Sequence, residues 1–477
     1  MNAPLIANVL GWLLVGIAGI QLVPLAAAFG FGEPALPYAA SAIAACVVGL
    51  AMALGSHSTD RRLRTRDGFL VVSAAWLIAS AFGSLPYIFS GTLGGVDAIF
   101  ESVSGFTTTG STVMAPIEGA PRALLLWRSL TQWLGGMGII LFAVALMPLL
   151  GVGGMQLFKA EVPGPVADKL TPRIAVTARR LWLIYVGMTA VEWALLVLAG
   201  MTPYEAACHS FTTMSTGGFS TLDGSIGGFD SALIEWIIIV FMTLAGVNFV
   251  LHYRLLTGRI GTALRDAELR YYLILLGGAA IVVYWALVHA NGIETFRTAL
   301  FQVVSVATTT GFATVDFEGW PAVALLVLLQ LMILGGMAGS TSGGVKSLRV
   351  LIGMKAVSSV FNRLGHRTAL GHPVDYGGKR VPDDVLAGIW AFLTAYFLLV
   401  VLVACAIGAA GYDILTSLSA ALTSVGNVGP GLAEIGPFDN FAHFPRAAKL
   451  TLCIAMIAGR LELFTILILF HRDFWRR

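Results

Sequence analysis

Four short stretches rich in threonine, serine and glycine carry the residue types best suited to chemistry in this chain. They occupy residues 107–112, 214–221, 305–314 and 423–429, and strongly apolar segments flank each one. Glycine adopts backbone dihedral angles that other residues resist, so successive carbonyl oxygens can turn toward one axis. Rings of such carbonyls replace the hydration shell of a dehydrated monovalent cation in selective pores. The stretches therefore predict four quarters of a single cation-selective pore.

The expected filter consists of four sets of four residues, aligned on one glycine in each stretch. Any one Thr/Gly cluster between apolar runs is most often an ordinary loop. Four copies at matched positions make that alternative a poor account of the whole set. We predict that the ion-binding backbone carbonyls belong to Thr108, Thr109, Gly110, Ser111, Thr216, Gly217, Gly218, Phe219, Thr309, Thr310, Gly311, Phe312, Ser424, Val425, Gly426 and Asn427.

Composition places these stretches in a membrane. Of 477 residues, 57% are hydrophobic and 12% are charged. Apolar runs near 20 residues recur from end to end, which is the length needed to cross a bilayer core of about 30 Å. The first run begins without a basic region or a clear cleavage site, so we expect a retained helix rather than a signal peptide. The four cysteines are scattered, which favours small buried residues over disulfides or a metal site.

The chain is predicted to be an all-α polytopic membrane protein with ten transmembrane helices. Four tandem helix–pore-loop–helix units would surround the pore in a pseudo-fourfold arrangement, as a search for internal repeats suggests. The expected units are an N-terminal helix pair at residues 1–60 and pore units at 68–150, 177–257, 268–361 and 382–477.

Charge gives the orientation. Most of the 29 Lys and Arg residues lie in alternate loops, at residues 61–66, 159–180, 254–270, 346–380 and 472–477. Loops rich in Lys and Arg stay on the cytoplasmic side of the membrane. Both termini should therefore be cytoplasmic, and all four Thr/Gly stretches should enter from the outside.

The second helix of the third unit contains an unusual interruption. Residues 334–346 hold five glycines and three hydroxyl residues, and each interior glycine costs about 1 kcal/mol relative to alanine. A closely packed, glycine-rich helix interface is the alternative. We predict an intramembrane gating loop at residues 335–346 under the filter. Its residues are Gly335, Gly336, Gly339, Ser340, Thr341, Ser342, Gly343, Gly344 and Lys346.

Arg460 is a charge within the apolar segment 450–470. A charge at such depth indicates a functional site by default. One hypothesis is hydrogen bonding to backbone carbonyls, and the other is an electrostatic barrier to cations beside the gating loop. Glu462 is too close in sequence to face it on a helix. Lys346 would either reinforce the barrier or be an ordinary interfacial lysine.

Three further polar residues are weaker candidates. Glu192 and Asn248 lie inside apolar helices and should be satisfied within helix packing. Glu101 lies on the first short helix and would raise the local cation concentration if it faced the outside.

The four Thr/Gly stretches together resemble the pore loops of the Trk/Ktr/HKT superfamily of potassium transport proteins. The residues that carry the resemblance are 107–112, 215–221, 308–314 and 425–431. The resemblance covers residues 69–477, and the preceding helical pair resembles the Trk branch. It implies K⁺ bound by filter carbonyls, a homodimer with a pore in each subunit, a gating loop in the third unit and an arginine in the last helix beside it. It also implies location in the bacterial inner membrane.

Regulation is expected to come from another protein. The chain contains no Walker A motif and no dinucleotide fingerprint. The resemblance implies a cytosolic TrkA-like regulatory subunit that binds ATP/ADP or NAD(H), and residues 159–180 and 346–383 are the expected docking surfaces. No covalent cofactor and no nucleic acid is expected, and membrane lipid is the other partner.

The leading hypothesis is a channel-like subunit that passes K⁺ and Rb⁺ better than Na⁺. Only the first and third stretches contain Thr-Thr-Thr-Gly, which predicts a less regular filter than in tetrameric potassium channels. The alternative is a Na⁺-dependent Ktr-type subunit or a K⁺/cation symporter. An integral membrane enzyme is disfavoured, because the sequence has neither a His-Glu-x-x-His motif nor carboxylates at ligand spacing.

Overall fold

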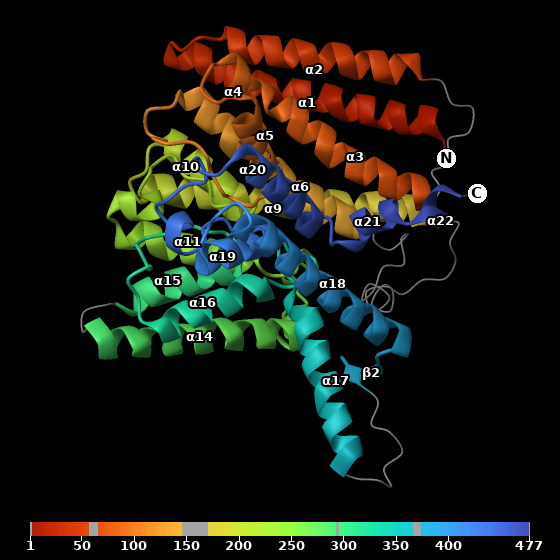
Figure 1. Ribbon diagram of the computed structural model, residues 1–477, viewed down its shortest axis with the longest axis vertical. Helices are drawn as coiled ribbons and strands as arrows, with labels where there is room; N and C mark the ends of the chain where they lie inside the picture. Colours follow the sequence, from red (N-terminus) through yellow and green to blue (C-terminus); the bar gives the residue numbers. More distant parts are fainter. Residues whose placement is uncertain (1, 57–64, 146–169, 292–294, 366–373, 477) are drawn as a thin grey trace.

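The computed structural model describes residues 2–56, 65–145, 170–291, 295–365 and 374–476. Within these residues the regular secondary structure is helical apart from one small hairpin, in which β1 (Asp375–Tyr376) pairs antiparallel with β2 (Lys379–Arg380). The hairpin is the one departure from the predicted all-α fold in the described part. The two chain termini lie at the same end of the helical body, and one helix projects away from that body (Figure 1).

The N-terminal pair consists of α1 (Ala3–Phe31) and α2 (Leu36–Gly55). The two helices pack closely because glycines face each other: a Cβ at Gly11 would lie 2.5 Å from Ala53 N, and one at Gly49 would lie 2.8 Å from Gly11 O. This pair forms an outer layer beside the rest of the molecule (Figure 1), and α1 packs against helices of the first repeated segment.

After α2 the order long helix, short helix, Thr/Gly stretch, second helix occurs four times. The long first helices are α3 (Thr65–Gly83), α9 (Leu170–Leu198), α14 (Ala267–Asn291) and α18 (Asp383–Gly408). The short helices are α5 (Gly95–Phe106), α10 (Pro203–Met214), α15 (Phe296–Ala307) and α19 (Ile414–Gly426). The second helices begin with α6 (Arg122–Ala145), α11 (Ala232–Ala245), α16 (Ala322–Leu334) and α20 (Arg446–Arg460).

The remaining described helices lie between or after these. They are α4 (Leu85–Phe89), α12 (Phe249–Leu256), α13 (Ile260–Leu264), α17 (Ser347–Gly365), α21 (Phe464–Leu467), α22 (Arg472–Trp475) and the 3₁₀ helices η2 (Ser225–Phe229), η3 (Ala433–Ile435) and η4 (Ile468–Phe470). Of these, α17 is the helix that projects from the body (Figure 1).

The starts of three short helices are defined by local hydrogen bonds. Thr202, Thr295 and Asp413 each accept a backbone N–H of the first turn through the side chain, and Thr202 forms a capping box with Glu205. Such caps satisfy backbone donors that would otherwise be unpaired, so the short helices begin at defined residues.

Six described helices are long and apolar enough to cross a membrane, and the number rises to eight if each of two bent pairs is one span. The six are α1, α2, Arg66–Phe89, Val176–Leu198, Ala267–Ala290 and α18. Two more of the ten expected spans, the second helices of the first and third units near residues 123–150 and 320–360, are not continuous described helices. The first extends beyond the described part, and the second is divided between α16 and α17.

Ten spans require the second helices of the second and fourth units to cross as single helices, expected near residues 231–256 and 444–470, and this expectation was wrong. α11 and α12 meet at an angle of 101°, and α20 meets Phe464–Phe470 at 108°. Asn248 starts α12 anew by accepting Val250 N, whereas Glu462 and Leu463 have positive φ angles of 55° and 49°. Each bent pair taken together is still long and apolar enough for one span, so hydrophobicity alone does not reveal the bends.

The second helices join neighbouring segments into a closed ring. α6 packs against α5 and α10, α11 against α10 and α15, α16 against α15 and α19, and α20 against α19 and α5. Each second helix therefore lies between the short helix of its own segment and that of the next, and the fourth segment returns to the first.

Candidate functional site

The four Thr/Gly stretches share one backbone conformation. Directly after each short helix, or one residue later, a non-glycine residue has positive φ, and two residues further on a glycine does too. The first positions are Thr108, Thr216, Thr309 and Asn427, with φ of 53°, 54°, 58° and 55°. The second are Gly110, Gly218, Gly311 and Gly429, with φ of 85°, 76°, 83° and 109°. The common spacing of these angles shows that the four stretches are conformational counterparts.

The fourth stretch differs from its predicted register by three residues. Gly426 is the last residue of α19, and Gly429 is the counterpart of Gly311. Asn427 takes the place of a threonine and donates through Nδ2 to Met456 O and Thr109 Oγ1, at 2.9 Å each. Ser424 and Val425 therefore belong to the short helix, and Val428 and Gly429 were missed. A threonine or asparagine two residues before a glycine, common to all four stretches, is the signal that could have found them.

The glycines of the four stretches form a closed ring of contacts with backbone carbonyls. A Cβ at Gly110 would lie 2.2 Å from Gly217 O, and one at Gly218 would lie 1.9 Å from Thr310 O. The ring continues from Gly311 to Val428 O at 2.1 Å and from Gly429 to Thr109 O at 2.9 Å. Side chains at these glycines would overlap the carbonyls, so the ring needs glycine for space as well as for its φ angles.

A cavity of about 470 Å³ adjoins this ring. All four ring glycines line it, together with polar residues that include Ser111, Thr112, Asp223 and Asn440. The four stretches therefore meet at one polar cavity, as expected for parts of a single pathway.

The first and third stretches share one kind of supporting hydrogen bond, whereas the second and fourth each have their own. In the second, Gln132 Nε2 donates to Gly217 O at 2.6 Å and Gln132 Oε1 accepts Phe219 N at 3.1 Å. In the fourth, Thr423 Oγ1 accepts Gly429 N at 2.8 Å. The hydroxyl pairs of the first and third are Thr107–Thr109 and Thr308–Thr310, at 2.7 and 2.8 Å. Gln132 was not singled out in the sequence, because nothing local marks it as a contact of a segment 85 residues away.

Glu101 is not an exposed outer acid. It is fully buried and forms a 2.6 Å ion pair with Arg128 Nε. Arg128 also donates to Ser220 O at 2.9 Å, and its guanidinium lies 3.6 Å from the centre of the Phe219 ring. The carboxylate thus fixes an arginine that supports the second stretch, and the expectation that Glu101 concentrates cations was wrong.

Asn248 and Glu192 have different surroundings. Asn248 caps α12 and lies beside Gly339, so its polar group is satisfied as expected. Glu192 is fully buried on α9, and neither carboxylate oxygen makes a hydrogen bond within the described residues. The expectation for Glu192 is therefore not met.

The helix of the third segment breaks at the predicted place. α16 ends at Leu334 and α17 begins at Ser347, and the twelve residues between them are not helical. Gly335, Gly339, Gly344 and Lys346 have positive φ angles between 70° and 77°. We call residues 335–346 the intramembrane loop.

The intramembrane loop lies directly against the Thr/Gly stretches. Gly343 N donates to Thr309 Oγ1 at 2.7 Å, and a Cβ at Gly343 would lie 2.1 Å from Gly426 O. Thr341 Oγ1 donates to Met214 O at 3.1 Å, at the end of the second short helix. One loop therefore contacts three of the four segments beside the ring.

Arg460 also contacts this loop. Its side chain is 2% exposed, and Nη1 donates to Thr341 O at 2.7 Å. Among the described residues no carboxylate lies within ion-pair distance of Arg460; Glu462 pairs with Arg349 instead. The sequence left two alternatives for Arg460, a hydrogen bond to a backbone carbonyl and a position beside the loop. The structure has both. Lys346 is buried and donates to Ser342 O, so it is not an interfacial lysine.

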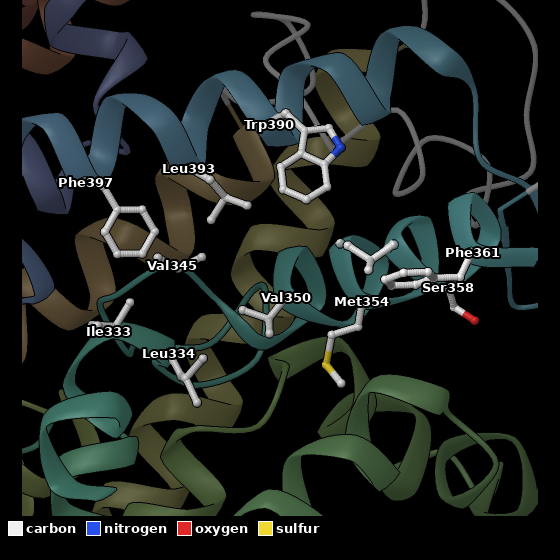
Figure 2. Close-up of a pocket in the computed structure, with 12 residues that line it drawn as sticks. Ile333, Leu334, Val345, Val350, Met354, Ser358, Phe361, Trp390, Leu393 and Phe397 are labelled. Carbon is white, nitrogen blue, oxygen red and sulfur yellow. The ribbon is translucent and has the colours of Figure 1, made fainter. Parts of the chain in front are cut away.

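An apolar cavity of about 580 Å³ lies on another side of the loop (Figure 2). Ile333 and Leu334 line it just before the loop, Val345 and Val350 at and after the loop's end, and Trp390, Leu393 and Phe397 come from α18. The helix ends on both sides of the loop, together with Val345 within it, therefore line this apolar cavity.

The expected docking surfaces are only partly described. Residues 159–169 and 366–373 lie outside the described residues, as do Arg61, Arg62 and Arg64 of the first basic loop. Within the described part, the projecting α17 and the β1–β2 hairpin belong to the second expected surface (Figure 1).

Comparisons with known proteins agree with this architecture. The family model TrkH, described as a cation transport protein, matches residues 38–476. The Trk system potassium uptake protein TrkH of Escherichia coli (strain K12) is 39% identical over 485 residues, with 100% of each chain covered. TrkG of the same strain, also a Trk system potassium uptake protein, is 40% identical over 422 residues, covering 87% of this chain and 86% of TrkG.

A solved structure is similar over the full length. The crystal structure of the potassium transporter TrkH from Vibrio parahaemolyticus superposes with a TM-score of 0.92 at 36% identity, covering 100% of both chains. The chain therefore belongs to the TrkH family of cation transport proteins, and it is a multi-pass membrane transport protein rather than an enzyme.

Proposed function

We propose that the chain is the ion-translocating membrane subunit of a Trk-type potassium uptake system, selective for K⁺ and Rb⁺ over Na⁺. The observation that carries the proposal is the closed ring of glycine–carbonyl contacts among the four stretches. Such a ring brings backbone oxygens of four segments to one axis, where they can replace the water around a dehydrated cation. The names of the similar uptake proteins support K⁺ as that cation.

The ion-binding carbonyls are proposed to lie at positions 108–111, 216–219, 309–312 and, in the corrected register, 427–430. The short helices direct their partly negative C-terminal ends toward these residues, which favours a cation. K⁺ is then the transported ion, and no covalently bound cofactor is needed.

Four pore units at residues 68–150, 177–257, 268–361 and 382–477 would surround this axis with pseudo-fourfold symmetry. With the N-terminal pair they would make ten spans, counting each bent or interrupted second helix as one. The positive-inside rule then puts both termini in the cytoplasm, and the bacterial inner membrane is the proposed location.

The intramembrane loop is proposed to be the gate. It lies against the ring through Gly343. Two buried basic side chains are close by: Lys346 belongs to the loop, and Arg460 of α20 donates to it. A positive charge at a narrow point of a low-dielectric pathway opposes the passage of another cation. Opening therefore requires the loop and its cations to move aside.

Control of this gate is proposed to come from a cytosolic TrkA-like subunit that binds ATP/ADP or NAD(H), acting on a homodimer of this chain. Residues 346–383, which include α17, and residues 159–180 are the proposed docking surfaces. α17 continues directly from the loop, so force on that helix would reach the gate without an intermediate element.

Ion flux into proteoliposomes tests the proposal. Purified protein should transport K⁺ and Rb⁺ faster than Na⁺ and Li⁺ at fixed membrane potential, and the regulatory subunit with nucleotide should change the rate. Equal K⁺ and Na⁺ flux would refute the selectivity. Uptake that requires Na⁺ or a proton gradient would instead favour a Na⁺-dependent Ktr-type subunit or a K⁺/cation symporter.

A further inference from the structure

Glu268 is a buried carboxylate in the first turn of α14. It is 3% exposed, and Asp266 Oδ1 holds the start of this helix by accepting the backbone N–H groups of Glu268 and Leu269. A carboxylate near a helix N-terminus is favourably placed with respect to the helix dipole. The backbone of Glu268 is thus fixed while its side chain reaches away from α14.

One oxygen of Glu268 holds both sides of the intramembrane loop, where residues 335–340 form its first arm and residues 341–346, with Ser347 that follows them, form its second arm. Oε1 accepts Ala338 N at 2.7 Å on the first arm and Ser347 Oγ at 2.8 Å directly after the loop. No other side-chain carboxylate within the described residues has hydrogen bonds to both arms.

Neighbouring contacts hold the same parts of the loop. Met337 N donates to Gly246 O at 2.9 Å, and Phe249 N donates to Gly339 O at 3.1 Å, so the first arm is bound to the bend between α11 and α12. Ser347 N donates to Gly336 O at 3.0 Å, which ties the two arms to each other. Glu268 lies where these contacts meet.

We propose that Glu268 is a positioning residue that latches the gating loop in its present place, and that opening requires its hydrogen bonds to both arms to be released. The inference rests on the proposed function of the loop as the gate. Both hydrogen bonds that the Glu268 side chain accepts come from residues outside the ring, so the latch acts on gating and leaves ion selection unchanged.

The latch has a clear energetic basis. A buried carboxylate that loses its donors retains the full cost of its desolvation, so the loop cannot leave Glu268 cheaply. Replacing the carboxylate with an apolar group removes both the bonds and this cost. Glutamine keeps one carbonyl oxygen of the same reach, so it can still accept from Ala338 N and Ser347 Oγ.

The test is K⁺ flux in proteoliposomes without the regulatory subunit. Glu268→Leu is expected to raise this flux about tenfold, because it removes two hydrogen bonds, each of which changes an equilibrium by about two- to tenfold. Glu268→Gln should stay close to the unsubstituted protein, and Ser347→Ala should give a smaller increase than Glu268→Leu. The K⁺/Na⁺ flux ratio should remain unchanged in all three variants. A merely structural role would predict lost flux, not gained flux.

Glu235→Leu is the matched control for Glu268→Leu. Glu235 is also a largely buried carboxylate with one basic partner, Arg297 at 2.7 Å, but it lies near the start of α11, away from the loop contacts at that helix's end. Its substitution is expected to leave flux without the partner unchanged. An equal increase in this variant would overturn the latch, because the effect would then be a general response to a lost buried carboxylate.

Arg460→Ala separates failure of the latch from failure of the gate. If Arg460→Ala raises flux while a folded Glu268→Leu does not, the latch is wrong and the gate stands. If neither raises flux, the gate itself is wrong and the latch falls with it. If Glu268→Leu does not fold, Ser347→Ala decides: raised flux supports the latch, and unaltered flux overturns it.

Discussion

The ring of Thr/Gly stretches and the layer below it, formed by the second helices and the intramembrane loop, are built from the same four repeated segments. Only the ring has the same conformation in all four segments. In the ring, each glycine contacts the carbonyl of the next segment in the same way. In the layer below, α6 runs on without interruption to the end of its described residues, α11 and α20 end in bends of 101° and 108°, and α16 ends at the intramembrane loop. An ion bound from four sides needs matching oxygens, whereas a gate needs one element free to move.

Charge separates the two regions as well. No charged side chain belongs to the ring positions, while Arg460, Lys346, Arg349 and Glu268 cluster around the loop within the described residues. Backbone dipoles can select an ion without holding it too tightly, and full charges can block it. Four experiments on substituted proteins test this division, in order of decreasing expected effect.

Gly311→Ser should damage selection most. A Cβ there would lie 2.1 Å from Val428 O, and φ is 83°, so the ring must distort. We expect the K⁺/Na⁺ flux ratio to fall roughly a hundredfold, which corresponds to about 2.8 kcal/mol. Flux of both ions in proteoliposomes measures it. Gly319→Ser is the control, because a Cβ at Gly319 has no neighbour within 4 Å; an unchanged ratio in Gly311→Ser would contradict the filter assignment.

Arg460→Ala should open the layer below the ring. It removes the charge and the 2.7 Å hydrogen bond to Thr341 O, so K⁺ flux without the regulatory subunit should rise about tenfold or more. The K⁺/Na⁺ ratio should stay constant, since the ring is untouched. Arg446→Ala, at the exposed start of the same helix, is the control. A folded Arg460→Ala variant with unaltered flux would rule out the barrier.

Gly429→Ala and Gly426→Ala together test the corrected register. Gly429 has a φ of 109° and belongs to the ring, whereas Gly426 is helical. We expect Gly429→Ala to lower the K⁺/Na⁺ ratio about tenfold, in keeping with the strain of about 1–2 kcal/mol that a side chain suffers at positive φ. Gly426→Ala, which crowds Met332 O at 2.8 Å, should reduce protein stability and keep the ratio. The reverse result would restore the register predicted from sequence.

Thr309→Val and Thr108→Val compare the same ring position in two segments. Thr309 Oγ1 accepts Gly343 N from the loop, while Thr108 Oγ1 has no hydrogen-bond partner in the described part of the chain. A neutral hydrogen bond contributes about 0.5–1.5 kcal/mol, so only Thr309→Val should raise K⁺ flux without the regulatory subunit, by about two- to tenfold. Equal effects of the two variants would mean that the ring and the loop are not coupled through Thr309.

The sequence by itself determined the membrane class, the four Thr/Gly stretches and the break at residues 335–346. These features are local: apolar length, glycine content and small polar residues are visible in a short window. The family resemblance could be recognised for the same reason, because each motif that carries it is one short continuous stretch of sequence.

Only the tertiary structure decided the register of the fourth stretch, the bends after α11 and α20, and the partners of the buried charges. Asn427 ends α19 with bonds to Thr109 and Met456, which lie 318 and 29 residues away. Glu101 forms an ion pair with Arg128, and Glu268 accepts a hydrogen bond from Ala338, which lies 70 residues further along the chain. Hydrophobic periodicity shows that a segment is buried, but it does not show which distant group completes a hydrogen bond there, because that depends on how the helices pack.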